Sequence, residues 1–357
     1  MNKLFSFNWQ TNYLFIPLAM AISFDLRYLA TKALSSEAKN GFLNTIVMFS
    51  GQMLNGSFEF CCSYKNKVFT NINKVPLFNN SFIRYDRILV FIAASLDLIS
   101  FTMLNYLIDE ENNIGELSLI LRMSQTIFMA PLVKLIVGTQ IHRHTIVSII
   151  IIALSLIGLI LFEAQIKYIQ NILLYILSYI INSLRIVVMK KTMEKYFYSA
   201  YKELFYVGLT GNIEMLVIIS ILSIFRDSTI SFTSVFCSPI TAMIGSPINF
   251  IYFISIFFTG SLFNTFGTTT NDLLSSLHVG IGDTLAGMIF LCYQPFDIDF
   301  LFNCIFIGII LLCCLICTEI IICNFCGMQG NTVKAIAERA ISEDNIKVNE
   351  ELLTDDG

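Results

Sequence analysis

Four acidic side chains occupy the interior of stretches that are otherwise apolar. Asp25, Asp97, Glu214 and Asp283 each lie near the middle of such a stretch. At the centre of a bilayer an ionisable group costs about 2.5–3.5 kcal/mol on insertion scales. We therefore expect these acids to line a polar pathway between helices, where they could take up protons, attract a cationic solute or orient a cation. For any one of them, an ion pair with a neighbouring helix or a protonated acid bonded to a backbone carbonyl is the structural alternative.

Basic and amide side chains interrupt stretches of the same kind. Arg122 and Gln125 lie in the segment "SLILRMSQTIFMAPLVKLIVG", and Arg185 and His278 lie in two later segments. A guanidinium forms paired, charge-assisted hydrogen bonds with phosphate or carboxylate. Arg122 is close enough to the end of its segment to snorkel to the surface instead, whereas Arg185 is deeper and needs a partner or a wet cavity. Together with the four acids, these residues indicate a polar pathway between the helices.

A faint internal duplication relates some of these residues. The phrases "FTMLNY" and "GSLFNT" place Asn105 and Asn264 at matching points, so we count both among the pathway residues. The text that follows each phrase, "GELSLILRM" and "NDLLSSLHV", pairs Arg122 with His278. The match is short, and chance similarity between apolar segments is the alternative. A true duplication would make His278 the counterpart of Arg122 in a second half of the chain.

The composition defines the solvent in which these residues must be held. Of 357 residues, 55% are hydrophobic and 13% are charged, and the mean hydropathy is +0.72. Soluble globular chains carry about 25% charged residues, so the soluble class is excluded. Ten apolar stretches reach about the 20 residues that cross a bilayer, and in lipid each must be helical because its backbone finds no other partners. These stretches are 13–33, 42–64, 88–108, 117–138, 144–163, 168–190, 203–225, 248–266, 273–293 and 300–322. The sequence therefore predicts an all-α polytopic membrane protein with ten transmembrane helices.

The distribution of charge predicts the orientation in the membrane. With the N-terminus in the cytosol, most lysine and arginine residues between helices fall on the cytosolic side, as the positive-inside rule requires. The opposite side carries the acidic cluster 109–116. Both termini are then cytosolic, and ten helices form two five-helix repeats, of which the second is inverted because five is odd. The predicted organisation is a cytosolic segment 1–12, repeats 13–163 and 164–326, and a largely disordered cytosolic tail 327–357.

Motifs for covalent chemistry do not occur in the sequence. It has no H-E-x-x-H, Walker or G-x-S-x-G pattern, so we expect neither an enzyme nor a cofactor. Several of the ten cysteines lie in an apolar run, where a thiol behaves as a small hydrophobe. Cys323 and Cys326 form a lone C-x-x-C pair, which is weak as a metal site. Their place at a helix end makes reversible palmitoylation a hypothesis for both.

The order of short motifs from about residue 13 to residue 326 resembles the drug/metabolite transporter superfamily. It is most similar to the solute carrier 35 (nucleotide-sugar-transporter-like) family and its F-type branch. The resemblance rests on "FLNTIVMFSGQ", on "AASLD" ending at Asp97, on the Leu-Arg step at Arg122, and on "FNTFG…LLSS…GDTL". Three positions depart from the family pattern: Gln52 and Thr210 stand in place of glutamates, and Val279 stands in place of an arginine. Because these residues would lie near the substrate, the resemblance implies the fold and leaves the substrate open.

The resemblance implies two inverted repeats around a central cavity that opens alternately to each side. In nucleotide-sugar relatives, an anionic nucleotide sugar is exchanged for a nucleoside monophosphate. Arg122 and Arg185 would then meet phosphate, while Asp97 and Asp283 would orient these arginines or take protons. The expected partners are the lipid bilayer, a small polar solute and a proton or counter-substrate, with no nucleic acid, and a homodimer is left open. The expected location is an endomembrane, either Golgi or lysosome/vacuole, ahead of the plasma membrane.

Two alternatives remain open from the sequence. The acids outnumber the cations at the midplane, which also suits a proton-coupled vacuolar or lysosomal carrier of a cationic or zwitterionic solute. A membrane scaffold that transports nothing and binds partners through its tail is the alternative from another class.

Overall fold

The computed structural model describes residues 5–7, 12–35, 37–65, 80–110, 121–163, 169–224, 231–291 and 298–323, together with 328, 332 and 335. At some element ends it describes the backbone alone. The side chains of the predicted acidic cluster lie outside the described part, as do Cys326 and nearly all of the predicted tail. The side chain of Asn105, which belongs to α3, also lies outside it.

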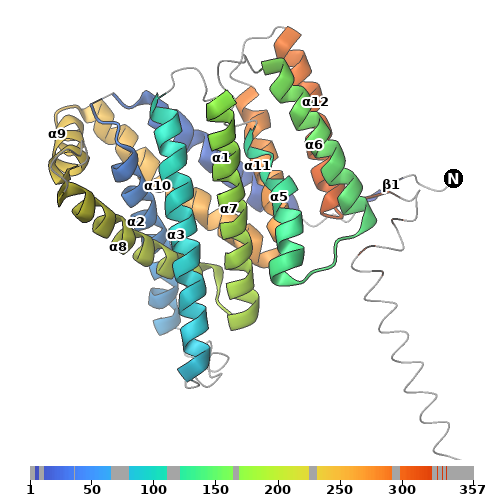
Figure 1. The fold of residues 1–357 in the computed structure, drawn as a ribbon, viewed down its shortest axis with the longest axis horizontal. Coiled ribbons are helices and arrows are strands. Elements are labelled where there is room, and N and C mark those ends of the chain that lie inside the picture. Colours follow the sequence, from blue (N-terminus) through green and yellow to red (C-terminus); the bar gives the residue numbers. More distant parts are fainter. Residues whose placement is uncertain are drawn as a thin grey trace, which may run out of the picture.

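Helices make up almost all of the described chain (Figure 1). In order they are α1 (Asn12–Ala33), α2 (Gly41–Lys65), α3 (Asn80–Glu110), α5 (Gln125–Leu132), η2 (Val133–Val137), α6 (Arg143–Glu163), α7 (Ile169–Tyr196), α8 (Ala200–Ile224), η4 (Thr233–Cys237), α9 (Ser238–Ile244), α10 (Pro247–Leu273), α11 (Ser276–Leu291) and α12 (Ile298–Cys317). Each of the ten predicted apolar ranges overlaps one of these helices, and the fourth range is shared by α5 and the π-helical η2.

Six helices of the described chain are long and apolar enough to cross a bilayer: α1, α3, α6, α7, α8 and α10. Shorter apolar helices cover Gln125–Val137, Thr233–Ile244 and Leu301–Cys317. The predicted class, an all-α integral membrane protein, is confirmed at this level. The count of ten spanning helices and the inverted repeats stay predictions.

The outer surface of α6 shows that the helix bundle is suited to contact lipid. A row of its large apolar side chains is exposed at helical spacing: Val147, Ile150, Leu154, Ile157 and Leu161. Residues three or four apart share one face of a helix. A continuous apolar face of this kind is not stable in water and is the surface that a bilayer covers.

The bundle is held together where small residues let backbones approach. The closest example lies between α2 and α8, where a Cβ added to Gly208 would come 2.6 Å from both the Met53 nitrogen and the Phe49 oxygen. At the same interface, a Cβ on Gly56 would lie 2.5 Å from the Phe205 nitrogen. Membrane helices associate largely through such close packing, because lipid supplies little hydrophobic driving force between them. The helices α1 and α10, α3 and α7, and α6 and α12 also pack side by side.

The η4–α9 pair was not predicted from the sequence. The two segments contain five and seven residues, which is too short for a bilayer span. The sequence predicted no helix between residues 225 and 248. The pair leads into α10, which begins with the N-cap Ser246 and Pro247 at the first helical position. The Ser246 side chain accepts a hydrogen bond from the Asn249 backbone nitrogen, as preferred N-cap residues do.

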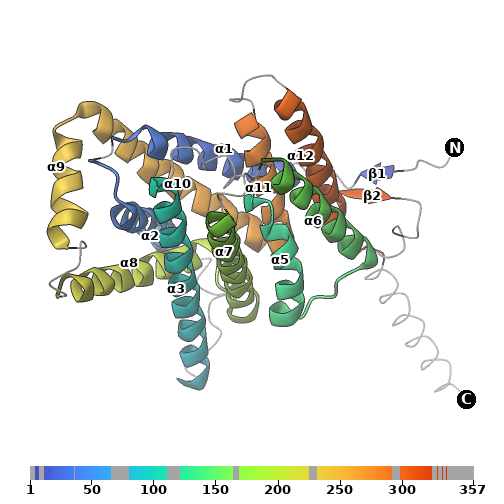
Figure 2. The same ribbon diagram turned by 45° about the horizontal axis from the view of Figure 1, so that its top comes forward.

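A short antiparallel ribbon joins the two ends of the described bundle (Figure 2). β1 (Phe5–Phe7) pairs with β2 (Ile321–Cys323), with Phe5 opposite Cys323 and Phe7 opposite Ile321. The sequence predicted a helix to residue 322, whereas α12 ends at Cys317. The chain turns out of the helix at Glu319, which has a φ of 60°, and the β-branched pair Ile321–Ile322 then favours a strand. The ribbon brings the segment before α1 and the segment after α12 to the same end of the bundle.

The connection between α7 and α8 is tied to the start of α3. The Tyr198 hydroxyl donates a 2.7 Å hydrogen bond to Asp86 Oδ2. Burial and this hydrogen bond both favour the neutral phenol and raise the pKa of Tyr198 above its usual value.

Candidate functional site

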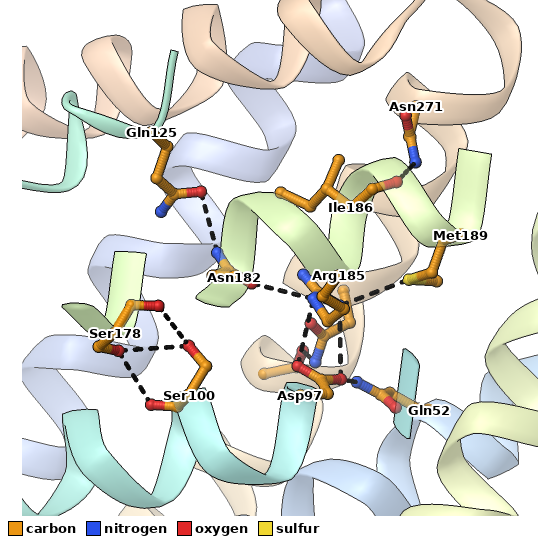
Figure 3. A network of polar contacts seen from close by, with 12 residues as sticks. Gln52, Asp97, Ser100, Gln125, Ser178, Asn182, Arg185, Ile186, Met189 and Asn271 are labelled. Atoms are coloured by element: carbon orange, nitrogen blue, oxygen red, sulfur yellow. Dashed lines mark hydrogen bonds and ion pairs between the residues drawn. The ribbon is translucent and has the colours of Figure 1, made fainter. Parts of the chain in front are cut away.

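The first part of the site is an ion pair between α3 and α7 (Figure 3). Arg185 Nε lies 3.3 Å from Asp97 Oδ1, and Arg185 Nη1 donates to Asp97 Oδ2 at 3.4 Å. Gln52 Nε2, from α2, donates to the same Oδ2 at 3.0 Å. Both charged side chains are buried, so each offsets much of the desolvation cost of the other.

A chain of amides extends this pair toward α5. Arg185 Nε donates to Asn182 Oδ1 at 2.9 Å, and Asn182 Nδ2 donates to Gln125 Oε1 at 2.9 Å. Arg185 and Asn182 lie three residues apart on α7, on one face of the helix. Figure 3 shows Gln125, Asn182, Arg185 and Asp97 as one continuous polar path across the bundle.

Two serines fix α3 against α7 beside that path. Each donates to the backbone oxygen of the other, Ser100 Oγ to Ser178 O at 3.2 Å and Ser178 Oγ to Ser100 O at 3.1 Å. Both are buried. Reciprocal bonds of this kind let the two helices approach closely and set the depth at which Asp97 faces Arg185.

The second ion pair joins the segment before α5 to α11. Arg122 Nε donates to Asp283 Oδ1 at 2.6 Å. The Arg122 guanidinium carbon also lies 3.7 Å from the ring centroid of Phe24 and 4.7 Å from that of Phe263, within the range of cation–π attraction. Arg122 is 4% exposed, so it does not snorkel to the surface, and for Asp97 and Asp283 the ion-pair alternative is the one observed.

Two small cavities meet at this network. One has a volume of about 20 Å³ and the other about 40 Å³, and by volume they hold one to a few water molecules. Both are lined by Arg122, Gln125, Asn182 and Phe263. We call these four side chains the dividing layer, because they alone appear in the lining of both cavities.

The cavities are displaced from each other along the helices. On α1 the first cavity is lined by Met20 and the second by Tyr28 and Thr31, whereas on α7 the first is lined by Met189 and the second by Tyr179. Met20 and Tyr28 are separated by about 12 Å of helix at 1.5 Å per residue. The first cavity therefore lies toward the end of α1 that follows the ribbon, and the second toward its opposite end.

Six of the nine residues predicted for the pathway come together here. They are Asp97, Arg122, Gln125, Arg185, Asn264 and Asp283, and Asn264 lines the first cavity. Glu214 lies apart, where its Oε1 accepts a 3.0 Å hydrogen bond from Ser95 Oγ at the contact of α8 with α3. His278 is also absent from the lining of both cavities, and its Nδ1 lies 2.7 Å from Ser275 Oγ. The side chain of Asn105 lies outside the described residues.

Several residues of the site were missed by reasoning from the sequence. Asn182 was overlooked, although its position one turn before Arg185 was a usable signal. Phe24 and Phe263 carried no signal, because phenylalanine in a membrane helix reads as lipid-facing or core packing. Only the fold brings their two rings to the same guanidinium.

Comparisons with known proteins bear on the fold alone. No protein-family model and no curated protein matches the sequence. A solved structure, described only as the crystal structure of a protein, superposes with a TM-score of 0.50 at 12% identity, over 85% of this chain and 98% of its own. The fold and the site together define an all-α integral membrane protein with two buried ion pairs at its centre.

Proposed function

We propose that the protein is a secondary transporter that moves a small polar solute by alternating access. The observation that carries the proposal is the pair of cavities on opposite sides of the dividing layer. A carrier needs one site that can be reached from either face but never from both at once. Here the layer that separates the cavities consists of side chains. A single hydrogen bond joins Asn182 to Gln125, and a cation–π contact joins Arg122 to Phe263. Such contacts can exchange partners without unfolding a helix.

The packing of the helices supports two inverted repeats. In chain order, α1, α2, α3, α5 and α6 would form the first half and α7, α8, α10, α11 and α12 the second. If each helix of the first half corresponds to the helix at the same position in the second half, the contact of α1 with α10 corresponds to that of α7 with α3. In the same way, the contact of α1 with α11 corresponds to that of α7 with α5. The contacts of α2 with α8 and of α6 with α12 each join a helix to its own counterpart in the other half. This is the pattern expected of an inverted-repeat carrier with its site between the halves, and it supports the resemblance to the drug/metabolite transporter superfamily.

The chemistry of the cavities favours an anionic group on the solute. Arg122 and Arg185 line the first cavity, and Arg27 and Arg122 line the second. Arginine is suited to phosphate and carboxylate, which fits exchange of a nucleotide sugar for a nucleotide. The present cavities admit only water, so a solute of that size requires the helices to separate at the dividing layer.

A second form of transport is favoured by one specific observation. Neither carboxylate oxygen of the buried Asp25 has a hydrogen-bond partner among the described residues. A free acid of this kind suits a proton-coupled carrier of a cationic or zwitterionic solute. In either form we place both chain ends in the cytosol, as the lysine and arginine distribution favours. We place the protein in an endomembrane, as the resemblance to the nucleotide-sugar-transporter-like family implies. The ribbon pairs the segment before α1 with the segment after α12. This pairing is compatible with an even number of transmembrane helices between the two segments.

The experiment that tests transport begins with a thermal-shift screen of the purified protein against nucleotides, nucleotide sugars, amino acids and amines. A ligand that binds the folded form stabilises it in proportion to its excess. Each hit is then measured as radiolabelled uptake into proteoliposomes loaded with unlabelled counter-substrate, with and without a pH gradient. We expect Arg122→Met to abolish uptake and Gly308→Ala, at an open position of α12, to preserve it.

The outcomes separate the candidates. Uptake that needs counter-substrate and ignores the pH gradient supports exchange, and uptake driven by the gradient supports proton coupling. A scaffold predicts no uptake of any hit and a cellular function that survives Arg122→Met but is lost on deletion of 327–357.

A further inference from the structure

Asp25 is a buried acid that the two ion pairs leave out. It lies on α1 and is 4% exposed, and both of its carboxylate oxygens are buried without a hydrogen-bond partner among the described residues. Its chain neighbour Phe24 carries the ring that lies against the Arg122 guanidinium. Asp25 is therefore close to the dividing layer but is not bonded to it.

Few charged groups lie on the elements around Asp25. α1 packs on α10 and α11, and α11 contributes Asp283 and His278. The segment before α5 contributes Arg122, the cation that interacts electrostatically with Asp25. α10 carries no charged residue before Asp272, near its far end. Arg122 is thus the opposite charge within reach of Asp25, and its Nε is already bonded to Asp283.

Arg27 belongs to α1 itself but is engaged elsewhere. Its guanidinium carbon lies 5.4 Å from the ring centroid of Phe101 on α3. It also lines the second cavity.

Counting charge shows what the arrangement of Asp25, Asp283 and Arg122 requires. If both acids were ionised, the three groups would carry a net charge of −1 in the buried interior of the bundle. Burying an unpaired charge costs several kcal/mol, and a buried group avoids this cost by changing its protonation state. One bound proton makes the three groups neutral.

We propose that Asp25 is a proton-binding site, protonated when Arg122 is bonded to Asp283, and that the two acids alternate as partners of this one arginine. When Arg122 moves from Asp283 to Asp25, the O–H bond of Asp25 breaks and its proton leaves to water. Asp283, now without its cation, takes up one proton, so the three groups hold one proton before and after the exchange. This inference rests on the proposed transport function and names the coupling ion as H⁺, with Asp25 rather than Asp97 as its carrier.

The test is infrared difference spectroscopy on the full chain in liposomes at neutral pH, with no solute present. A protonated carboxylic acid and an ionised carboxylate absorb at separate frequencies, and only the protonated band shifts in D₂O. Subtracting the Asp25→Asn spectrum from that of the wild type should show loss of one protonated-acid band. The same subtraction with Asp283→Asn should show loss of a carboxylate band. In an Arg122→Met background, Asp283→Asn should instead remove a protonated-acid band.

Two results would overturn the proposal: loss of a carboxylate band in Asp25→Asn, or an Asp283 signal that stays ionised in the Arg122→Met background. If Asp25→Asn does not fold, the wild type can still refute the proposal. Absence of any protonated-acid band at neutral pH would do so. Because the spectra are recorded without solute, a result that refutes this proposal does not refute the proposed transport function. A protonated Asp25 in a protein that moves none of the screened solutes would instead refute transport.

Discussion

Replacing Arg122 and Asp283, singly and together, measures whether the central ion pair exists with the geometry described. The contact of 2.6 Å is made by side chains that are 5% and 0% exposed. Arg122→Met keeps an unbranched stem between the rings of Phe24 and Phe263 but leaves the Asp283 carboxylate without its cation. Asp283→Ala leaves a buried guanidinium. Removing one partner of a buried pair costs about 3–5 kcal/mol, whereas replacing both charges by apolar groups is often close to neutral.

The expected result is therefore strong non-additivity. The two single variants should each lose about 3–5 kcal/mol of unfolding free energy, and the double variant should lose much less than their sum. The coupling energy should exceed about 3 kcal/mol, at or above the upper end for residues in contact. The assay is reversible unfolding in mixed micelles, with the helical circular dichroism signal as the measure of folded protein.

A matched cycle controls for general destabilisation. Glu214 lies at the contact of α8 with α3, where it bonds to Ser95 and not to Arg122. Arg122→Met combined with Glu214→Gln should be additive within about 0.5 kcal/mol, as distant sites are. If the effects of the Arg122 and Asp283 substitutions are also additive, the two side chains do not form an ion pair.

Three further predictions concern packing, access and pH. Gly208→Ala should lower the free energy of unfolding by about 1–3 kcal/mol, the cost of overpacking, because the new methyl group would meet the backbone of α2. Gly308→Ala should change it little, because a methyl group there meets no atom within 4 Å. In a cysteine-free background, Thr31→Cys and Thr268→Cys should react with a membrane-impermeant maleimide from opposite faces, and reaction of both from the same face would refute the two-cavity arrangement. The raised pKa of Tyr198 contributes stability below the ordinary tyrosine pKa that is lost as the pH rises above it, so the alkaline fall in melting temperature should be weaker in Tyr198→Phe than in the wild type.

The sequence identified the ionisable residues of the site better than their arrangement. Arginine and aspartate inside apolar segments were visible because each is costly in lipid, and Asp97, Arg122, Arg185 and Asp283 do meet at the centre. Which acid pairs with which base was not predictable, because each pair joins segments more than 80 residues apart. The depth estimate for Arg122 allowed snorkelling, since position along one segment says nothing about which neighbour covers it.

Glu214 shows the opposite error. Its depth in an apolar segment resembles that of Asp97, yet it bonds to Ser95 away from the cavities. Depth is a property of one helix, whereas the direction in which a side chain faces depends on how that helix is rotated against its neighbours. A one-dimensional pattern cannot supply that rotation.

The sequence by itself determined the lipid environment, the helical class and the approximate place of the helices other than η4 and α9. A bilayer allows few structures for an apolar stretch of about 20 residues, so these features follow from local composition. The tertiary structure decided the two ion pairs, the amide chain through Asn182, the dividing layer and the position of Asp25 outside both ion pairs. These features depend on contacts between distant segments, and a change in the packing of one helix would alter them without changing any local pattern.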